Sequence, residues 1–147
     1  MKILREIIDK KKSTLLGVGP MSFNCVNATI ELANENNVPL MMIASRRQID
    51  SKKMNGGYVN NWTTKEFSSY VNANDIKKKI ILSRDHGGPY QNNLEYEKKL
   101  TIEQAMSSAK ESFKEDIINN FKIIHIDPSV DPSGNLNTDI ILERLKE

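Results

Sequence analysis

One stretch of the chain combines the residue types that acid–base and metal chemistry require. The apolar run Ile80–Leu82 is followed closely by Asp85-His86-Gly87-Gly88-Pro89. A buried parallel strand that ends in polar groups has this pattern, and α/β proteins place their chemistry at such ends. The histidine could bind a metal ion, the aspartate could transfer a proton, and the glycines would let a substrate approach the backbone. A loop cap beside a surface imidazole is the open alternative.

A second pair of candidate residues lies later in the chain. His125 and Asp127 are two residues apart, so they share one face of a strand, while Ile124 and Ile126 take the other. The polar face could line the mouth of a barrel, or His125 could be a buried histidine bonded to a neighbouring strand. The chain has 2 histidines. Catalytic zinc usually takes three protein ligands, which both histidines with Asp85 or Asp127 could supply, although the spacing does not require it.

The residues after the second apolar run could bind an anion. Arg46 and Arg47 follow this run directly and could hold a phosphate or carboxylate through paired hydrogen bonds, although exposed arginines without a ligand show the same pattern. Gly56-Gly57-Tyr58 follows in the same loop and could form a lid, a phosphate-side turn or a plain surface loop. Cys25 has no base beside it in the sequence, so we interpret it as structural.

Four short apolar runs, each followed by a helical pattern, would position these residues. The predicted strands cover 14–18, 38–44, 79–83 and 122–126, with a polar loop over 84–93 after the third. The predicted helices cover 1–12, a segment capped by Ser22 or Asn24, a segment capped by Thr63 or Thr64 with Glu66, most of 94–118 with its main part starting at Thr101, and 138–146. The loop over 45–62 is long for a compact domain, which favours a functional role.

This order of elements indicates an α/β fold of parallel strands joined by right-handed crossovers. The 147 residues suit a single domain over 1–147 with about four βα repeats. Two architectures fit: an open four-stranded parallel sheet, or the N-terminal half of a TIM (β/α)8 barrel, which takes about 250 residues when complete. Because the chain ends on a helix, we favour the half barrel, whose two outer strands would need partners.

Composition argues against several classes of protein. The net charge of +2 gives no support for a nucleic-acid partner, and the lysines at 10–12 and 77–79 are interpreted as solvated surface. A single cysteine cannot form an internal disulfide, which fits a reducing, cytoplasmic location. We recognise no signal peptide, and no apolar run approaches the roughly 18 residues of a membrane span, so no membrane partner is expected.

Four short motifs, taken together and in order, resemble one protein family. They are Ala44-Ser45 with Gln48, Gly56-Gly57-Tyr58, Asp85-His86 with Gly88-Pro89, and His125-Ile126-Asp127 with Ser129. From about Thr14 to its end, the chain resembles the class II tagatose-bisphosphate aldolase non-catalytic subunit family. The resemblance implies a (β/α)8 barrel related to the zinc-dependent class II ketose-bisphosphate aldolases. It also implies a role in bacterial carbohydrate metabolism beside a catalytic aldolase subunit.

The resemblance further implies roles for individual residues. Asp85 would be the catalytic proton-transfer acid and His86 a Zn²⁺ ligand, with the remaining zinc ligands in the later half of the barrel. The residues expected to contact a sugar phosphate are Ser45, Gln48, Gly57, Tyr58, His125 and Asp127. The expected partners are a small-molecule sugar phosphate, a catalytic aldolase subunit or the C-terminal half-barrel, and further copies of the chain through self-association.

Three places depart from the family pattern. Arg84 replaces a small residue before Asp-His, Met42 and Ile43 occupy a region where the family has an acid, and Pro128 is atypical. A cation at Arg84 would weaken metal binding unless its side chain points away. Our main expectation is a subunit that binds a sugar phosphate or supports an aldolase. The alternatives are a metal-dependent class II lyase that cleaves a ketose bisphosphate, and a sugar isomerase or epimerase on the same barrel.

Overall fold

The four expected strands form one parallel sheet. The computed structural model describes residues 5–6, 9 and 14–147. Its strands are β1 (Gly17–Val18), β2 (Leu40–Ser45), β3 (Ile80–Gly87) and β4 (Ile123–Ile126), and they pair in parallel in the order β1-β2-β3-β4. The sheet does not close, and β1 and β4 are its edges. The expectation of four βα units, as in half of a (β/α)8 barrel, is therefore confirmed.

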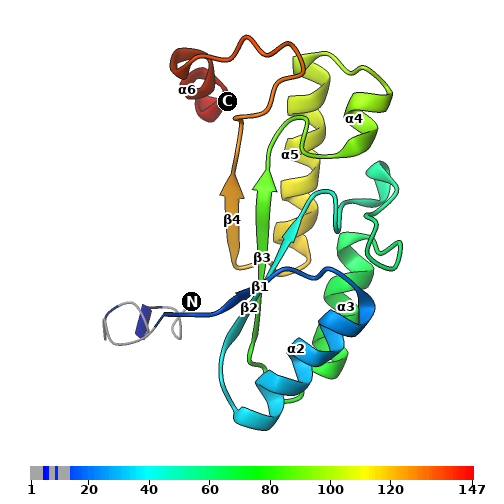
Figure 1. Ribbon diagram of the computed structural model, residues 1–147, viewed down its shortest axis with the longest axis vertical. Coiled ribbons are helices and arrows are strands. Elements are labelled where there is room, and N and C mark those ends of the chain that lie inside the picture. The colour runs from blue at the N-terminus through cyan, green and yellow to red at the C-terminus, as the bar shows by residue number, and fades with distance from the viewer. Residues whose placement is uncertain (1–4, 7–8, 10–13) are drawn as a thin grey trace.

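Helices supply the crossovers that parallel strands require. The helices α2 (Phe23–Asn36), α3 (Thr64–Asn74) and α5 (Ile102–Ile118) lie on one side of the sheet (Figure 1). The shorter helices α4 (Asn93–Glu97) and α6 (Thr138–Lys146) lie toward the end to which the strands point (Figure 1). The helix predicted over 1–12 lies outside the described residues except at 5–6 and 9. No helix in the described residues is long and apolar enough to cross a membrane.

The helix starts follow from local capping chemistry. The Ser22 side chain accepts a hydrogen bond from the N–H of Cys25, so Ser22 caps α2 and the alternative cap, Asn24, is wrong. Thr63 and Glu66 form a reciprocal capping box at the start of α3. Thr101 caps α5 in the same way, which separates α5 from the short α4. These caps satisfy backbone N–H groups that a helix leaves unpaired.

The hydrophobic core lies between the sheet and the helices α2, α3 and α5. It includes Met42 and Leu82 from the strands, Val26, Ile30, Phe67 and Val71 from the helices, and Phe121 from the turn between α5 and β4. A nearly unbroken apolar run such as that of β2 is typical of a strand covered on both faces, but only one face of β2 is fully buried. Burial alternates along β2, with the second face intermediate, because an open sheet has no facing strands to cover it.

The third strand is longer than predicted, and this changes how the candidate site is built. β3 continues through Asp85 and His86 to Gly87, although the sequence predicted a loop from 84. Its pairing with β4 is irregular between Arg84 and Gly87. His86 has a φ of 44°, in the left-handed region, which is uncommon for a residue with a side chain. The strand therefore carries a local irregularity at the candidate site, as bulges beside active sites often do.

The long loop between β2 and α3 is ordered by its own backbone contacts. It contains a 3-10 turn, η1 (Lys52–Met54), and an isolated parallel bridge between Asp50 and Thr63. The N–H of Val59 donates to the carbonyl of Gln48 at 3.1 Å. The loop is therefore folded back onto the end of β2 rather than extended into solvent.

Two arginines that the sequence placed near the candidate site are buried beneath it. Arg84 donates to both carboxylate oxygens of Asp116, at 2.8 and 2.6 Å. Its guanidinium carbon, Cζ, lies over the Phe121 ring, 5.3 Å from the ring centroid. Burial acts to lower the pKa of Arg84, but hydrogen bonds and charge from Asp116 raise it above its ordinary value. The Arg84 guanidinium is thus paired with Asp116 of α5 rather than with Asp85 or His86.

Arg46 is likewise fully buried, so the interpretation as an exposed arginine or a phosphate grip is wrong for this residue. Its guanidinium pairs with Asp50 at 3.0 Å and Glu95 at 2.9 Å, and it donates to the Gly88 carbonyl at 2.6 Å and the Ser108 hydroxyl at 2.9 Å. All sides of the guanidinium are thus occupied. Arg46 ties the loop after β2 to the loop after β3 and to α5.

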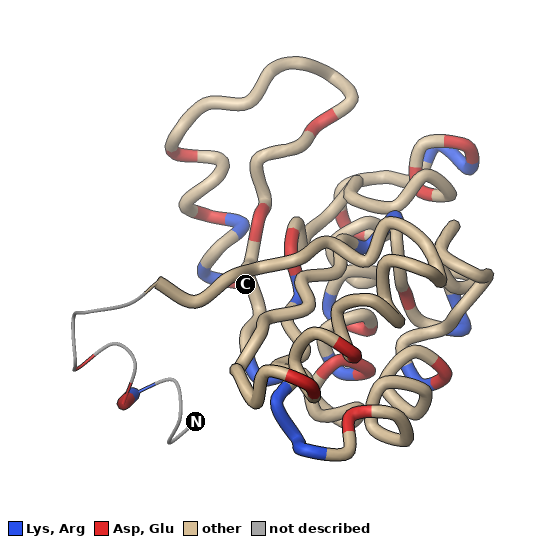
Figure 2. The backbone as a smooth tube through the Cα atoms, turned by 60° about the horizontal axis from the view of Figure 1, so that its bottom comes forward, with Lys and Arg blue, Asp and Glu red and all other residues tan. Residues whose placement is uncertain are grey.

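Charged residues elsewhere are distributed along the chain. Acidic and basic residues are interspersed over the described backbone, and the basic run at 77–79 lies in the turn between α3 and β3 (Figure 2). Lys77 and Lys78 are exposed. This agrees with the interpretation of the run as solvated surface.

Candidate functional site

The two His/Asp pairs recognised in the sequence come together at the carboxyl end of the sheet. Asp85 and His86 come from β3, His125 comes from β4, and Asp127 follows β4 directly. We call these four residues the strand-end cluster. His86 Nδ1 lies 2.9 Å from Asp127 Oδ2, and His125 Nδ1 lies 3.4 Å from Asp85 Oδ1. The two imidazole rings meet edge to face, with centroids 6.1 Å apart.

The irregularity in β3 lets two consecutive residues contribute to one cluster. Neighbouring side chains on a regular strand point to opposite faces. Here the left-handed φ of His86 turns its ring so that Nε2 lies 3.6 Å from Asp85 Oδ2. The His86 side chain is 55% exposed, whereas that of Asp127 is only 11% exposed. Within the cluster, the His86 imidazole is therefore accessible to solvent, whereas the Asp127 carboxylate is largely buried.

The Asp127 carboxylate accepts hydrogen bonds from several neighbouring groups. Its Oδ2 accepts from Gln91 Nε2 at 2.8 Å, and its Oδ1 accepts from the backbone N–H of Ser129 at 3.1 Å and from the Ser129 hydroxyl. Partial burial acts to raise the pKa of Asp127, but hydrogen bonds from Ser129 and His86 lower it below its ordinary value. Sequence reasoning missed Gln91, because nothing in a polar loop shows which amide folds back.

An ionised Asp127 determines the tautomer of His86. A carboxylate can only accept, so Nδ1 of His86 must carry the proton, and neutral His86 presents an unprotonated Nε2 toward Asp85 and solvent. We expect ¹⁵N–¹H long-range correlation spectra of neutral His86 to show the Nδ1–H tautomer. In Asp127→Leu the population should shift toward Nε2–H. An Nε2–H tautomer in the wild-type protein would contradict the assignment.

Ser45, Gln48 and Tyr58 form a second group at the end of β2. Ser45 is the register partner of Asp85 across the sheet, so this group adjoins the strand-end cluster. Gln48 Oε1 accepts from the N–H of Ser45 at 2.8 Å, and Gln48 Nε2 lies 3.1 Å from the sulfur of Met21. The Tyr58 hydroxyl lies 3.6 Å from the same sulfur. Met21 was not recognised from the sequence, because a thioether carries no distinctive signal.

Gly57 contributes through its backbone. A Cβ at this position would lie 2.0 Å from the Gln48 carbonyl oxygen, so only glycine allows this approach. The close approach holds Tyr58 beside the end of β2, where its N–H donates to the Arg47 carbonyl at 3.0 Å. The structure therefore gives Gly57 a loop-closing role, and contact with a substrate stays a prediction.

Cys25 fits its structural interpretation. Its thiol donates to the Gly19 carbonyl, with a sulfur–oxygen distance of 3.4 Å, near the start of α2.

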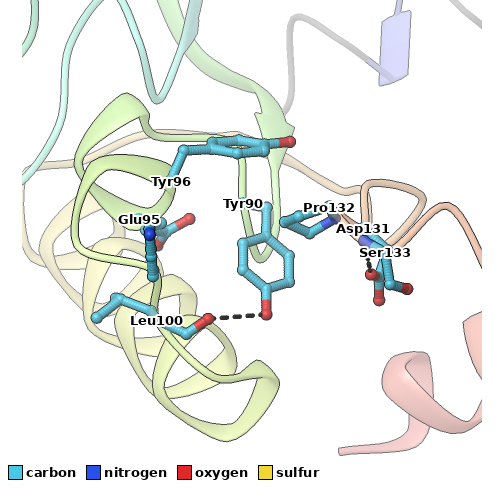
Figure 3. A pocket seen from close by; sticks show the side chains of 8 residues that line it. Tyr90, Glu95, Tyr96, Leu100, Asp131, Pro132 and Ser133 are labelled. Atoms are coloured by element: carbon cyan, nitrogen blue, oxygen red, sulfur yellow. Dashed lines mark hydrogen bonds between the residues drawn. The ribbon is translucent and has the colours of Figure 1, made fainter.

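A pocket of about 270 Å³ lies between α4 and the loop after β4 (Figure 3). Tyr90 and Tyr96 lie on one part of its wall and Asp131 on another (Figure 3). The Tyr90 hydroxyl donates to the Leu100 carbonyl at 3.1 Å. Asp131 pairs with Arg144 of α6 and accepts from the N–H of Ser133 at 2.8 Å.

The Asp131–Arg144 pair attaches α6 and should respond to acid. Hydrogen bonds from Ser133 and then Arg144 lower the pKa of Asp131 to about 2. A lowered folded-state pKa stabilises the folded form above the ordinary value near 3.8, and this contribution is lost as the pH falls toward 2. We expect amides of α6 to exchange hydrogen faster as the pH falls through this range, relative to amides of α5 and after correction for intrinsic rates. Asp131→Asn should show fast exchange already at pH 6.

The described residues alone do not fit the zinc site that the resemblance implies. Within the described part of the chain, no three His, Cys, Asp or Glu side chains are placed to hold one metal ion. His86 Nδ1 is already bonded to Asp127, which leaves Nε2 as its only available ligand atom. Zinc binding through His86 therefore requires ligands from elsewhere and stays a prediction.

The four parallel βα units have the architecture of half of a (β/α)8 barrel, and the candidate residues lie at the carboxyl ends of its strands. The sequence model of the D-tagatose-1,6-bisphosphate aldolase subunit GatZ/KbaZ-like family matches residues 3–145, and the chain belongs to this family. The family resemblance proposed from the motifs is thus confirmed.

A solved structure shares the fold. The chain is similar to the crystal structure of a probable tagatose 6 phosphate kinase from Sinorhizobium meliloti 1021, with a TM-score of 0.71 and 21% sequence identity. The match covers 90% of this chain and 34% of that one. The chain therefore spans about a third of the length of that protein.

Proposed function

We propose that the chain is part of a tagatose-bisphosphate aldolase subunit-like protein of bacterial carbohydrate metabolism, which binds a sugar phosphate and supports a catalytic aldolase subunit in the cytoplasm. Family membership supports the general role. The observation that carries the proposal is the strand-end cluster, in which Asp85, His86, His125 and Asp127 meet at the carboxyl end of two parallel strands. Ligands of open α/β sheets bind at this end.

The cluster contains the groups that proton transfer next to a carbonyl requires. Asp85 is 39% exposed and lies between the two histidines, so it can reach a ligand. His86 presents Nε2, and Asp127 with Gln91 holds the ring in place. In this proposal Asp85 moves the proton, while Ser45, Gln48 and Tyr58 orient the sugar phosphate from the end of β2.

Calorimetric titration with tagatose 1,6-bisphosphate, with tagatose itself as the control ligand, tests this function. We expect saturable binding of the bisphosphate that is lost in Asp85→Asn and His86→Ala. Metal content measured by mass spectrometry on the chain together with the C-terminal half-barrel tests the zinc prediction, which expects stoichiometric zinc with wild-type His86 and none with His86→Ala. Absence of bisphosphate binding in the folded wild-type protein would contradict the proposed function.

The open edges of the sheet support the proposed partners. Among the described residues, the edge strands β1 and β4 each pair with one neighbour only, and Ile126 of β4 is 53% exposed. A further barrel segment, a catalytic subunit or a second copy would cover these edges. Light scattering during size-exclusion chromatography should show self-association of the isolated chain, and a stable monomer would contradict it.

A further inference from the structure

A small polar pocket lies on the other side of the loop after β2. It has a volume of about 190 Å³ and lies between this loop and α4. The side chains that matter for binding are those of Arg47, Asn55, Tyr58, Asn93 and Glu97, which are all exposed. We call this the Arg47 pocket. It shares only Gly57 and Tyr58 with the residues that the motifs singled out for substrate contact.

The structure separates two neighbouring arginines that look equivalent in the sequence. Arg46 is fully buried. Its guanidinium forms ion pairs with Asp50 and Glu95 and donates hydrogen bonds to the Gly88 carbonyl and the Ser108 hydroxyl. The Arg47 guanidinium is exposed and takes part in no hydrogen bond or ion pair within the described residues. An exposed guanidinium in a pocket offers a planar set of donors that matches a phosphate or carboxylate.

The backbone of the loop fixes the position of Arg47 relative to Tyr58. The Tyr58 N–H donates to the Arg47 carbonyl at 3.0 Å, and the adjoining Gly57 packs against the Gln48 carbonyl too closely for any other residue. Asn55 and Gly56 both have a positive φ, 61° and 70°, and their N–H groups donate to the carbonyls of Lys52 and Ser51, which closes a tight turn. The Arg47 pocket is therefore formed by a closed loop rather than by mobile side chains alone.

The other side chains of the pocket suit a polyol. Asn55 and Asn93 can each donate and accept, Glu97 can accept from hydroxyl groups, and the Tyr58 ring offers an apolar face. None of the Asn55, Asn93 and Glu97 side chains has a hydrogen-bond partner within the described residues. The volume is below the roughly 300–1,000 Å³ of pockets that enclose a whole drug-sized ligand, so the pocket would take one end of a larger molecule.

The neighbouring pocket between α4 and the loop after β4 is a weaker candidate. Its two carboxylates already have cationic partners, Glu95 with Arg46 and Asp131 with Arg144. A ligand there would have to displace an existing ion pair. In the Arg47 pocket the cation is available without such a cost.

We propose that the Arg47 pocket is a subsite for the phosphorylated end of a sugar phosphate, with Arg47 on the phosphate and Tyr58, Asn55, Asn93 and Glu97 around the adjoining hydroxyl groups. The proposal rests on the proposed function, because it takes a sugar phosphate as the ligand. It adds a site that lies outside the strand-end cluster and uses an arginine from a different loop.

Titration of the intact chain with inorganic phosphate and with tagatose 6-phosphate, at constant ionic strength, tests the subsite. We expect Arg47→Ala to weaken the binding of both ligands at least tenfold, and Arg47→Lys to restore part of the affinity because it keeps the charge but not the planar donor set. Tyr58→Ala should weaken the binding of tagatose 6-phosphate and leave the affinity for inorganic phosphate unchanged. The thermal melt of each variant should match the wild type, since Arg47 and Tyr58 are exposed.

The controls distinguish this subsite from the strand-end cluster. Lys98→Ala removes one positive charge from an exposed residue outside the pocket and should change neither affinity more than twofold. His86→Ala should leave inorganic phosphate binding intact even if the proposed function fails. Phosphate binding that is lost in His86→Ala but retained in Arg47→Ala, or no saturable phosphate binding by the wild type, would overturn the subsite.

Discussion

Replacing Arg84 with methionine is expected to lower the free energy of unfolding by about 3–5 kcal/mol, because removal of one partner of a buried ion pair leaves the other charge uncompensated. Arg84 and Asp116 both have fully buried side chains, joined at 2.6 Å. Arg84 also donates to the carbonyls of Ala44 and Ile49, which would lose a partner. Urea denaturation followed by far-UV circular dichroism measures the change.

Two further variants test whether the loss of stability comes from the buried ion pair. The double variant Arg84→Met/Asp116→Leu should recover much of the lost stability, since replacing a buried pair by apolar groups is often neutral. Lys114→Met breaks the exposed pair with Glu111 and should leave the free energy of unfolding close to the wild-type value. An Arg84→Met protein as stable as Lys114→Met would show that Arg84 is not the buried structural cation described here.

The Gly88→Ala variant should disrupt the fold and the candidate site together. A Cβ at Gly88 would lie 1.9 Å from the Asp127 carbonyl oxygen and 2.6 Å from its carbonyl carbon, so the backbone must shift. Overpacking of this kind typically costs about 1–3 kcal/mol. The shift moves Asp127 away from His86, so we expect the pKa of Asp127 to rise toward its ordinary value, as measured by carboxyl ¹³C titration.

The stability of Gly88→Ala should also depend on pH differently from that of the wild type. In the wild type the lowered pKa of Asp127 favours the folded state above the ordinary carboxyl pKa, and this contribution disappears as the pH falls through the lowered value. Gly88→Ala should therefore lose less stability over this acid range than the wild type. The matched control is Gly19→Ala, whose nearest contact would be an ordinary 3.5 Å, so its stability and its Asp127 titration should stay close to wild type.

The sequence predicted the order and type of the elements well because their signals are local. The apolar runs that became β2, β3 and β4 need only neighbouring residues to be recognised, and so do the caps at Thr63 and Thr101. The strand ends were less certain. The length of β3 was underestimated because Asp85 and His86 look like turn residues, whereas pairing with β2 and β4 keeps them in the sheet.

For the candidate site, the sequence by itself indicated which residues have side chains suited to chemistry. The Asp85-His86 and His125/Asp127 pairs, and the end of β2 with Ser45 and Gln48, were recognised from residue type and from their place after apolar runs. Periodicity also predicted that these strand ends would share one edge of a parallel sheet. Family membership and the four βα units follow from the same local patterns.

Only the tertiary structure decided which of these side chains act together. His86 reaches Asp127 across 41 positions of sequence, and Arg84 reaches Asp116 across 32. The sequence could not show that Arg46 is buried and Arg47 exposed, because neighbouring residues have the same local composition. Burial and hydrogen-bond partners are set by segments that come together only on folding, and these contacts make Arg46 a buried structural cation and leave Arg47 exposed.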